Sequence, residues 1–350
     1  MLHFLLGWVS TMSDLGQISS FDNSDVNKLL AALRTNLCRA MPQEMKVELC
    51  GGHIFVYRFE HEHKCSNASI YKPMITFMIN GQKTSAIGDS QFIYNAGDIF
   101  ISGVDIPAQF MVKDVSHEQP GFSVSIYIDP AMLQEIMSQL PPLNQQELLN
   151  SEFSANSDRA TAAEILTLSR IVDLYTNGVN YDFPYSLLLK ELYFYVLTAK
   201  HGMSLRKIFT NGAQDYKIAK AIHYLRENFR DDVAIENLAG MVYMAVPTFY
   251  KHFKQVTAMS PLQYLKRLRL YEAKRLMISN SLTAAAAGYE VGYSSEQHFS
   301  RDYKKLFGRP PLQDIKESTF VPYHNPFTDS PANVELPVNN DEETAAMIQA

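Results

Sequence analysis

Hydrophobic residues recur at helical spacing in two segments towards the end of the chain, fifty positions apart. The two sets are Phe249, Phe253 and Val256, and then Phe299, Tyr303 and Leu306. Positions i, i+4 and i+7 lie on one face of a helix, so each segment is predicted to be a helix with one buried face. A pattern repeated at a fixed offset indicates one supersecondary unit used twice.

The repeat continues on both sides of these helices. The pairs fifty positions apart are Lys254 and Lys304, Pro261 and Pro311, Leu262 and Leu312, Gln263 and Gln313, Lys266 and Lys316, and Tyr243 and Tyr293. Upstream of each helix we expect a short helical segment, at 235–242 and 282–287, followed by a brief turn. Helix, short turn and second helix is the form of a helix-turn-helix DNA reader.

The side chains outside the two hydrophobic stripes are mostly polar or basic. In the first unit they are Pro247, Thr248, Tyr250, Lys251 and Lys254, and in the second Glu296, Gln297, Ser300, Arg301 and Lys304. Arg and Lys bind guanine edges and phosphates, and Gln pairs with adenine. We expect these ten residues to face DNA, although most contacts go to phosphate and sugar, so base contacts by individual side chains stay open. An ordinary solvated surface is the alternative.

A third helix is expected between the two units, from Pro261 to Ile278, because Ser260 suits the N-cap and Pro261 the first helical position. Its buried stripe is predicted to be Leu262, Leu265, Leu268 and Leu276, and its basic flank Lys266, Arg267, Arg269, Lys274 and Arg275. Such a helix is about 27 Å long. A spacer of that order can hold two readers in major grooves about one DNA turn, roughly 34–36 Å, apart.

The first half of the chain has a different pattern. Short β-branched or aromatic runs, with turn signals between many of them, occur at 47–49, 53–59, 75–79, 92–94, 99–102, 109–112 and 122–128. They predict an antiparallel barrel or sandwich. Helical patterns precede and follow it at 25–39, with Ser24 as a possible cap, and at 131–140, 160–175 and 184–200. The last two helices can complete the core or pair across a dimer.

Charge is distributed unevenly along the 350 residues, whose formal net charge is −6. Residues 212–317 hold 16 basic and 11 acidic side chains and are net positive, as a nucleic-acid footprint should be. Residues 318–350 hold five acids and no Lys or Arg. The expected organisation is an N-terminal extension (1–20), a β-rich domain (21–200), a linker (201–214), a tandem helix-turn-helix domain (215–317) and a disordered acidic tail (318–350).

Cysteine usage and hydropathy bear on the compartment. Cys38, Cys50 and Cys65 are the only cysteines, and no pairing pattern suggests disulfides or a zinc module. No run approaches the ~20 apolar residues of a membrane span. The opening residues 1–9 are apolar but have no basic start, so no signal peptide is expected, and Met12 is a possible start. We expect a cytoplasmic protein without membrane contact.

Two segments carry a family resemblance. The runs GYSSEQHFSRDYKKLFGRPP at 292–311, MSPLQYLKRLRL at 259–270 and AKRL at 273–276 resemble the signature of AraC/XylS-type transcription regulators, over about 215–316. The resemblance implies DNA contacts by Pro247, Thr248, Tyr250, Lys251, Glu296, Gln297, Ser300 and Arg301. Two positions depart from it: Ala258 stands where many members have Gly, and Gly288 where many have Ala. Glu296 is repelled by DNA unless it accepts from a cytosine amine.

The front half resembles the amino-terminal region of an AraC subgroup. The similarity is carried by Lys72-Pro73, Gly81-Gln82-Lys83, Gly97-Asp98, Asp105-Ile106-Pro107 and the run at 190–198. It implies a cupin-like sensory and dimerising domain. The expected fold is therefore α+β: an N-terminal β-rich, cupin-like barrel with flanking helices, then an all-α domain of two helix-turn-helix units joined by a long helix.

The function expected from these features is a one-component DNA-binding transcription regulator. Its partners would be double-stranded DNA, RNA polymerase, an unknown small-molecule effector and a second copy in a homodimer. Effector or dimer contacts would shift the population of states that present the two readers. We expect no cofactor, metal or catalytic residue.

Three alternatives remain. A metal-dependent cupin enzyme would use His61 and His63, but these belong to a polar run, expected to be a loop, without a complete ligand set. A constitutive activator would bind DNA without an effector. Redox sensing by the cysteines would need an activated thiolate.

Overall fold

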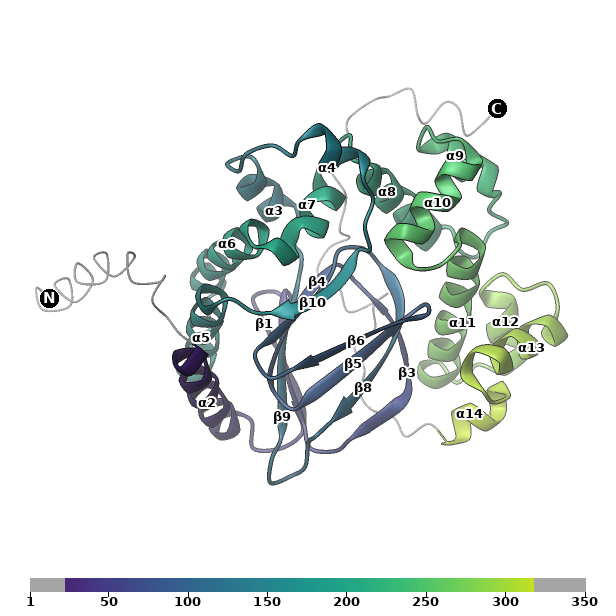
Figure 1. Cartoon of the computed structure of the whole chain (residues 1–350). Helices are drawn as coiled ribbons and strands as arrows, with labels where there is room; N and C mark the ends of the chain where they lie inside the picture. Colours follow the sequence, from purple (N-terminus) through teal and green to yellow (C-terminus); the bar gives the residue numbers. More distant parts are fainter. Residues whose placement is uncertain (1–22, 318–350) are drawn as a thin grey trace, which may run out of the picture.

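The computed structural model describes residues 23–317, with the side chains of residues 23–25, 63–69 and 317 excepted. The expected extension at 1–20 and acidic tail at 318–350 lie outside the described residues. A β-rich part with flanking helices comes first, and a second, all-helical part lies beside it (Figure 1). This arrangement confirms the expected α+β fold class.

The β-rich part consists of two antiparallel sheets. One has the order β1-β2-β9-β4-β7-β10 and the other β3-β8-β5-β6. The strands are β1 (Met45–Leu49), β2 (Ile54–Phe59), β3 (His63–Tyr71), β4 (Met74–Asn80), β5 (Gln82–Ile87), β6 (Ser90–Asn95), β7 (Asp98–Ser102), β8 (Ile106–Lys113), β9 (Gly121–Tyr127) and β10 (Ala155–Arg159). All seven strands expected from the sequence are present, whereas β3, β5 and β10 were missed. We call the two sheets together the barrel.

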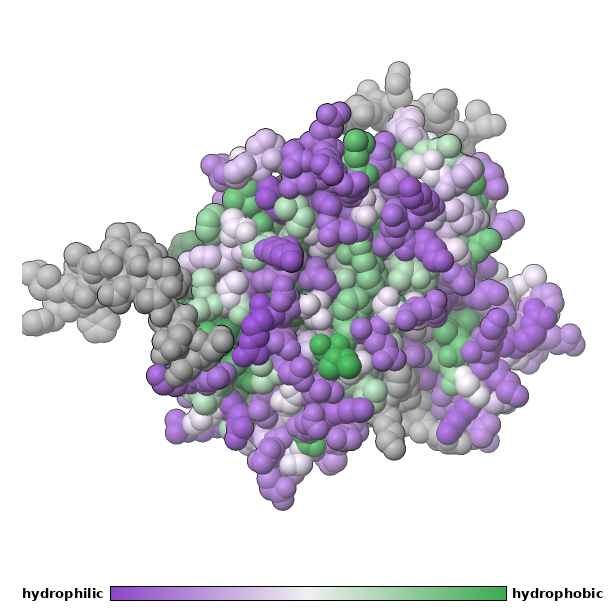
Figure 2. All heavy atoms as spheres, in the orientation of Figure 1, coloured by the Kyte–Doolittle hydropathy of each residue, from purple (hydrophilic) through white to green (hydrophobic). Residues whose placement is uncertain are grey.

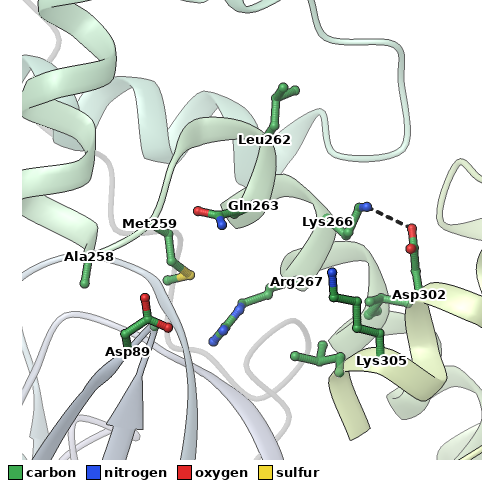
Figure 3. A pocket seen from close by; sticks show the side chains of 12 residues that line it. Asp89, Ala258, Met259, Leu262, Gln263, Lys266, Arg267, Asp302 and Lys305 are labelled. Carbon is green, nitrogen blue, oxygen red and sulfur yellow. Dashed lines mark ion pairs between the residues drawn. The ribbon is translucent and has the colours of Figure 1, made fainter. Parts of the chain in front are cut away.

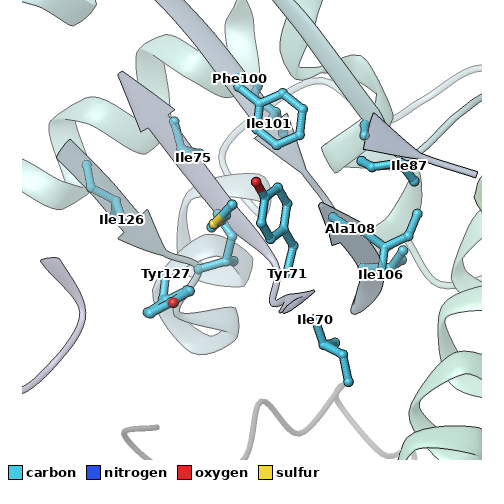
Figure 4. Close-up of a cluster of buried hydrophobic side chains, with 14 of the residues drawn as sticks. Ile70, Tyr71, Ile75, Ile87, Phe100, Ile101, Ile106, Ala108, Ile126 and Tyr127 are labelled. Carbon is cyan, nitrogen blue, oxygen red and sulfur yellow. The ribbon is translucent and has the colours of Figure 1, made fainter. Parts of the chain in front are cut away.

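The two sheets of the barrel face each other through aromatic side chains. The Phe100 ring on β7 stacks on the Tyr94 ring of β6, with ring centroids 5.1 Å apart. It also makes an edge contact with the Tyr71 ring on β3, with centroids 5.9 Å apart (Figure 4). The next residue on β7, Ile101, points the other way because side chains alternate along a strand. Its neighbours Ile75 and Ile126 share that outer face. The barrel therefore has an inner face between the sheets and an apolar outer face.

Helices flank the barrel in the first part of the chain (Figure 1). They are α2 (Asn23–Ala40), α3 (Pro130–Met137), α4 (Gln145–Leu149), α5 (Ala162–Thr176), α6 (Asp182–Thr198), a 3-10 turn at Lys200–Gly202 and α7 (Met203–Phe209). Helix α2 packs on β4, and α5 packs between α2 and α6. The four helices expected in this half are found, but α2 begins at Asn23, so Ser24 lies within the helix rather than at its cap.

The segment expected to be a loose linker, 201–214, is largely helical. Helix α7 buries Leu205, Ile208 and Phe209 completely or nearly so. Gly202 packs tightly too, since a Cβ there would meet the Val196 carbonyl oxygen at 1.9 Å. The two parts of the chain are therefore joined by a packed helix, and the boundary at 201–214 stays a prediction.

Up to residue 317, where the described residues end, seven helices form the C-terminal part. They are α8 (Gln214–Glu227), α9 (Ile235–Met241), α10 (Val246–Thr257), α11 (Pro261–Ser279), α12 (Ala284–Glu290), α13 (Glu296–Phe307) and α14 (Pro311–Glu317). Helices α9 and α10 form one helix-turn-helix unit, α12 and α13 the other, and α11 joins them (Figure 1). Helix α12 begins and ends later than the expected 282–287.

Candidate nucleic-acid interface

Helix α10, the second helix of the first unit, has one buried and one exposed side. Phe249, Phe253 and Val256 are fully buried, as the hydrophobic spacing predicted. The exposed positions are Pro247, Thr248, Lys251 and Lys254, whereas Tyr250 is half-buried. Pro247 fits the first turn because the backbone N–H that proline lacks has no helical partner there.

Helix α13 repeats this arrangement in the second unit. Phe299 and Tyr303 are fully buried, and Leu306 is half-buried rather than buried. Side chains exposed on the other side are Glu296, Gln297, Arg301 and Lys304, and Ser300 is half-buried. Figure 2 shows mainly hydrophilic side chains in the region of α13, at the right of the view. We call α10 and α13 the reader helices.

The reader helices carry cations that have no carboxylate partner in the described part of the chain. Among the described residues, Lys251, Lys254, Arg301 and Lys304 form no ion pair. Asp302, the nearest acid in sequence to Arg301, instead pairs with Lys266 of α11 at 3.0 Å. The positive charge of the readers is therefore available to an external anion such as a phosphate.

The turns inside the two units do not match as the sequence comparison suggested. In the first unit, the amide of Tyr243 donates to the Gly240 carbonyl oxygen and that of Met244 to the Ala239 carbonyl oxygen. In the second unit, the amides of Gly292 and Tyr293 donate to the carbonyl oxygens of Tyr289 and Gly288. Tyr243 therefore corresponds to Gly292, and Met244 to Tyr293. Both Tyr243 (φ 54°) and Gly292 (φ 87°) adopt the left-handed conformation that this turn requires. The pairing of Tyr243 with Tyr293 was wrong because the second turn is one residue longer.

The reader helices end in the same way but with different residues. Gly308 (φ 81°) ends α13 and Ala258 (φ 58°) ends α10, both in the left-handed region. Only glycine adopts this region without steric cost. Ala258, one of the two departures from the family pattern, is therefore a strained cap.

Gly288, the other departure, has a packing reason. A Cβ at this position would lie 2.9 Å from Cγ of Phe299. Phe299 is the fully buried anchor of α13. The glycine lets α12 and its reader helix approach closely, so local packing accounts for the departure.

Helix α11 holds the two units but differs in detail from its prediction. It runs to Ser279 and begins with a capping box between Ser260 and Gln263. Its length is about 28 Å. Leu265, Leu268 and Leu276 are buried as expected, whereas Leu262 is 55% exposed, so its assignment to the buried stripe was wrong.

The basic flank of α11 serves the protein itself. Arg269 donates to the carbonyl oxygens of Phe229, Asp231 and Gly292, at 2.6, 2.7 and 3.1 Å. Lys274 is buried and pairs with Asp314 of α14 at 2.7 Å, and Arg275 pairs with Glu272. Arg269 and Lys274 thus connect other parts of the helical domain to α11, whereas Arg275 pairs within α11 itself.

The helical part is bound to the barrel through a buried ion pair. Arg226 of α8 pairs with Asp105, just before β8, at 2.9 Å, and both side chains are buried. The Tyr264 hydroxyl donates to the Asp105 carbonyl oxygen at 2.8 Å. The Asp105 charge raises the pKa of Arg226 above its ordinary value and so favours the charged guanidinium.

The end of the first reader helix also touches the barrel side. Ser154 donates its amide and its hydroxyl to the Val256 carbonyl oxygen, at 3.0 and 2.8 Å. Ser151 Oγ lies 2.7 Å from Nδ1 of His252. Gly88, in the β5–β6 turn, approaches so closely that a Cβ there would lie 2.9 Å from the Ala258 carbonyl oxygen. The first reader helix is therefore held against the barrel.

A pocket of about 310 Å³ separates the barrel from α11 and α13 beside this contact. Its lining includes Asp89 from the barrel, Arg267 from α11 and Lys305 from α13. Arg267 extends towards Asp89 (Figure 3). The second reader helix thus lines a pocket between itself and the barrel. The first reader helix, by contrast, accepts hydrogen bonds from Ser154.

The residues considered for metal or redox chemistry do not form a site in the described part of the chain. His61 is exposed and its Nδ1 lies 3.1 Å from Glu44, while His63 begins β3 rather than lying in the expected loop. No group of three potential metal ligands gathers among the described residues. Burial, and then the charge of Asp182, raise the pKa of the Cys50 thiol to about 11, the opposite of an activated thiolate.

Family models match both parts of the chain. The model of the AraC-type transcriptional regulator N-terminus matches residues 53–204, and a helix-turn-helix domain model matches residues 238–316. The first range covers β2 to α6, and the second runs from within α9 into α14. In the described residues, no helix is long and apolar enough to cross a membrane.

Similar proteins agree with these matches. The chain is 25% identical over 181 residues to the HTH-type transcriptional activator RhaS of Salmonella agona, covering 52% of this chain and 63% of that protein. It is 24% identical over 153 residues to RhaS of Pectobacterium atrosepticum, covering 44% of this chain and 55% of that one. The chain thus spans rather more than half the length of these relatives.

A solved structure shares the fold. ToxT of Vibrio cholerae, crystallised with an unsaturated fatty acid bound, matches with a TM-score of 0.50 at 12% identity, over 77% of this chain and 98% of that one. At this identity the likeness concerns the fold alone. The two family models, the repeated helix-turn-helix units and the barrel lead to one assignment. This chain belongs to the AraC family of transcription regulators.

Proposed function

We propose that this protein regulates transcription by binding a specific DNA site with both reader helices. The observation that carries the proposal is the repeated pair of helices with buried aromatic anchors and unpaired, exposed cations. Helix α11 holds them on one rigid frame through Arg269 and Lys274. Each reader helix would enter a major groove, about one turn from the other.

The ten predicted contact residues have different roles in this proposal. Lys251, Gln297 and Arg301 are exposed and long enough to read base edges. Lys254 and Lys304 lie in the C-terminal half of each reader helix, about one turn beyond the base-reading residues, and would bind phosphates. Pro247, Thr248 and Glu296 lie at the helix beginnings, which approach the bases first. Tyr250 and Ser300 are half-buried, so only their exposed edges would contribute.

The barrel would receive the signal. We propose that residues 21–200 bind a small-molecule effector and that the buried Asp105–Arg226 contact transmits its effect to residues 215–317. Binding shifts the equilibrium only if the effector prefers one arrangement of the readers over the other. A constitutive activator is the competing proposal, and it predicts the same DNA binding in the presence and absence of any effector.

A homodimer is part of the proposal. Helix α6 exposes Phe183, Leu187 and Phe194 along one side, at 71%, 53% and 46%. Exposed aromatic and aliphatic side chains in a row are typical of association surfaces. Pairing of α6 with its copy would bring two tandem readers to one operator. RNA polymerase would be the partner if the output is activation, as for the RhaS relatives, and the site of action the cytoplasm.

The experiment that tests the proposal is capture of genomic DNA fragments by the purified full chain. We expect a motif with two sequence blocks about one helical turn apart. Lys251→Ala and Arg301→Ala should each weaken capture and relax one block, whereas Lys113→Ala, at an exposed position of β8, should change neither. Capture without any motif at moderate salt, by all variants equally, would contradict sequence-specific reading.

A further inference from the structure

The inner face of the barrel carries a set of polar side chains. The Ser85 hydroxyl lies 2.9 Å from the Tyr71 hydroxyl and 3.0 Å from that of Tyr94, and all three are buried. On the facing sheet Thr76 and Ser125 are hydrogen-bonded at 2.9 Å. A core built only for stability is normally apolar, because buried polar groups need partners. The composition of this interior therefore needs another explanation.

Lys83 points into the same interior. It pairs in register with Tyr94 of β6 and Val112 of β8, so its side chain lies on their face of the sheet. Tyr94 stacks on Phe100 of the facing sheet, which shows that this face is the inner one. The Lys83 ammonium leans over the ring of Phe110, 4.7 Å from its centre. Only 6% of the residue is exposed.

Within the described part of the chain, the Lys83 ammonium has no anionic partner. No described side chain forms an ion pair or hydrogen bond with it, and it lies over the face of the Phe110 ring. Two other titratable groups on this face, Tyr71 and Tyr94, share hydrogen bonds with Ser85. Burial lowers the pKa of Lys83 to about 8, so the charged form is destabilised but still present near pH 7.

A second polar atom on the inner face lacks a partner. Ser123 Oγ is buried without a hydrogen bond, and Ser123 lies on the same side of β9 as Ser125. The Phe110 ring lies beside Lys83, and Phe100, which stacks on Tyr94, faces the same interior. The interior thus combines a cation and a free hydroxyl with aromatic surface, the composition of a small-molecule site.

We propose that the barrel binds a carboxylate with an apolar body, whose charged group is held by Lys83 and whose body lies among the aromatic rings. A carboxylate would neutralise the buried ammonium and accept its hydrogen bonds, which are the strong, charge-assisted kind. The Ser123 hydroxyl would gain an acceptor or donor partner. The proposal rests on the proposed function, because it names the chemical class of the effector.

Thermal unfolding of the full chain tests the proposal with matched probes. Benzoate and octanoate are compared with benzamide and octanamide, at constant ionic strength set by sodium chloride. The proteins are the wild type, Lys83→Met and Lys113→Met. Lys113 is the matched control because it lies on neighbouring β8, opposite Gln82, but is exposed.

The expected result shows both whether the ligand must be a carboxylate and whether Lys83 is the residue that binds it. At least one carboxylate should raise the Tm of the wild type and of Lys113→Met, while its amide should do so at concentrations at least about tenfold higher. Lys83→Met should lose this difference. Without ligand, Lys83→Met should have a higher Tm than the wild type, since it replaces an unpaired buried charge by an apolar side chain of similar length.

Each other result would overturn the proposal. These are equal responses to acid and amide, a carboxylate response retained by Lys83→Met, an equal response to chloride or phosphate, and no response of the wild type at about 10 mM probe. A lower Tm, or failure to fold, of Lys83→Met would show a structural role for the lysine instead. DNA capture is measured separately, so loss of specific DNA binding would count against the proposed function alone.

Discussion

Asp105 before β8 and Arg226 in α8 form a buried ion pair at 2.9 Å across the junction between the barrel and the DNA-binding part. Tyr264 of α11 donates to the Asp105 carbonyl oxygen, so one residue of the barrel binds two helices of the other part. A buried pair fixes geometry more than it adds stability, because desolvation opposes the Coulomb attraction. This contact is thus suited to set how the readers are presented.

Removing one partner of this pair should be costly. Asp105→Ala leaves the Arg226 charge buried and uncompensated, so we expect a loss of about 3–5 kcal/mol in the free energy of unfolding. Denaturant unfolding measures it. Glu135→Ala is the matched control, since its ion pair with Lys190 has a similar distance of 2.7 Å but both side chains are exposed. The control should cost less than about 1 kcal/mol. Equal losses would show that burial does not matter here.

The two helix caps predict opposite effects of similar changes. Ala258→Gly should stabilise the protein by about 0.5–1 kcal/mol, because glycine relieves the left-handed backbone. Gly308→Ala should destabilise it by about 1 kcal/mol through the backbone alone. A Cβ at Gly308 meets nothing within 4 Å, so no clash contributes. Thermal unfolding of both variants checks the pair, and a destabilised Ala258→Gly would refute the strain at that cap.

Two helical glycines should also respond differently to alanine. Gly288→Ala places a Cβ 2.9 Å from the Phe299 ring, so we expect a loss of about 1–3 kcal/mol through overpacking. Gly240→Ala meets nothing within 4 Å and should gain up to about 1 kcal/mol from helix propensity. Unfolding free energies of both variants decide this. A neutral Gly288→Ala would mean that α12 moves away without cost.

Asp215, at the beginning of α8, predicts a pH dependence. Burial raises its pKa to about 6, although the Glu152 amide and Ser151 donate to it. A carboxyl with a raised pKa binds its proton more tightly in the folded state, so its contribution to stability is lost as the pH rises from about 4 to 6. Asp215→Asn should therefore be more stable than the wild type above pH 6, by up to about 3 kcal/mol, and equal to it below pH 4.

Urea unfolding between about pH 4 and 7.5 measures this difference. Comparing the two proteins at each pH removes the contributions of other carboxyls, such as Glu60, whose pKa is lowered chiefly by its hydrogen bond with His117. A difference that is constant over this range would contradict the raised pKa.

The helix-turn-helix units were predictable because their signal is local. The spacing of Phe249 and Phe253, and of Phe299 and Tyr303, fixes which side of each helix is buried. The turn between the helices was less predictable. It requires a left-handed residue, and in the first unit this residue is Tyr243 rather than a glycine that would mark it.

Two of the missed strands, β5 and β10, were missed for different physical reasons. Strand β5 places Lys83 and Ser85 on the inner face, where a hydrophobic alternation would normally be expected. A polar interior reverses the pattern on which strand prediction depends. Strand β10 lies at a sheet edge and reads Ala-Asn-Ser-Asp-Arg. Its pairing with β7 depends on tertiary context rather than on its own sequence.

The role of the basic residues on α11 could not be read from composition either. Arg269 and Lys274 resemble DNA-facing charges in the sequence, yet each meets partners that lie far away along the chain, such as Phe229 and Asp314. Arg301 and Lys251 have no such partner among the described residues. The positive charge that remains free to bind DNA is therefore on the reader helices, where the sequence pattern also predicted the DNA contacts.

The central claim, that two reader helices bind one DNA site, is tested most directly by footprinting on a captured fragment. The wild type should protect two blocks about one helical turn apart. Lys251→Ala should lose protection of one block and Arg301→Ala of the other, each at a cost of about 1–3 kcal/mol if the contact is to a base. Protection of a single block, or loss of the same block in both variants, would contradict the tandem reader.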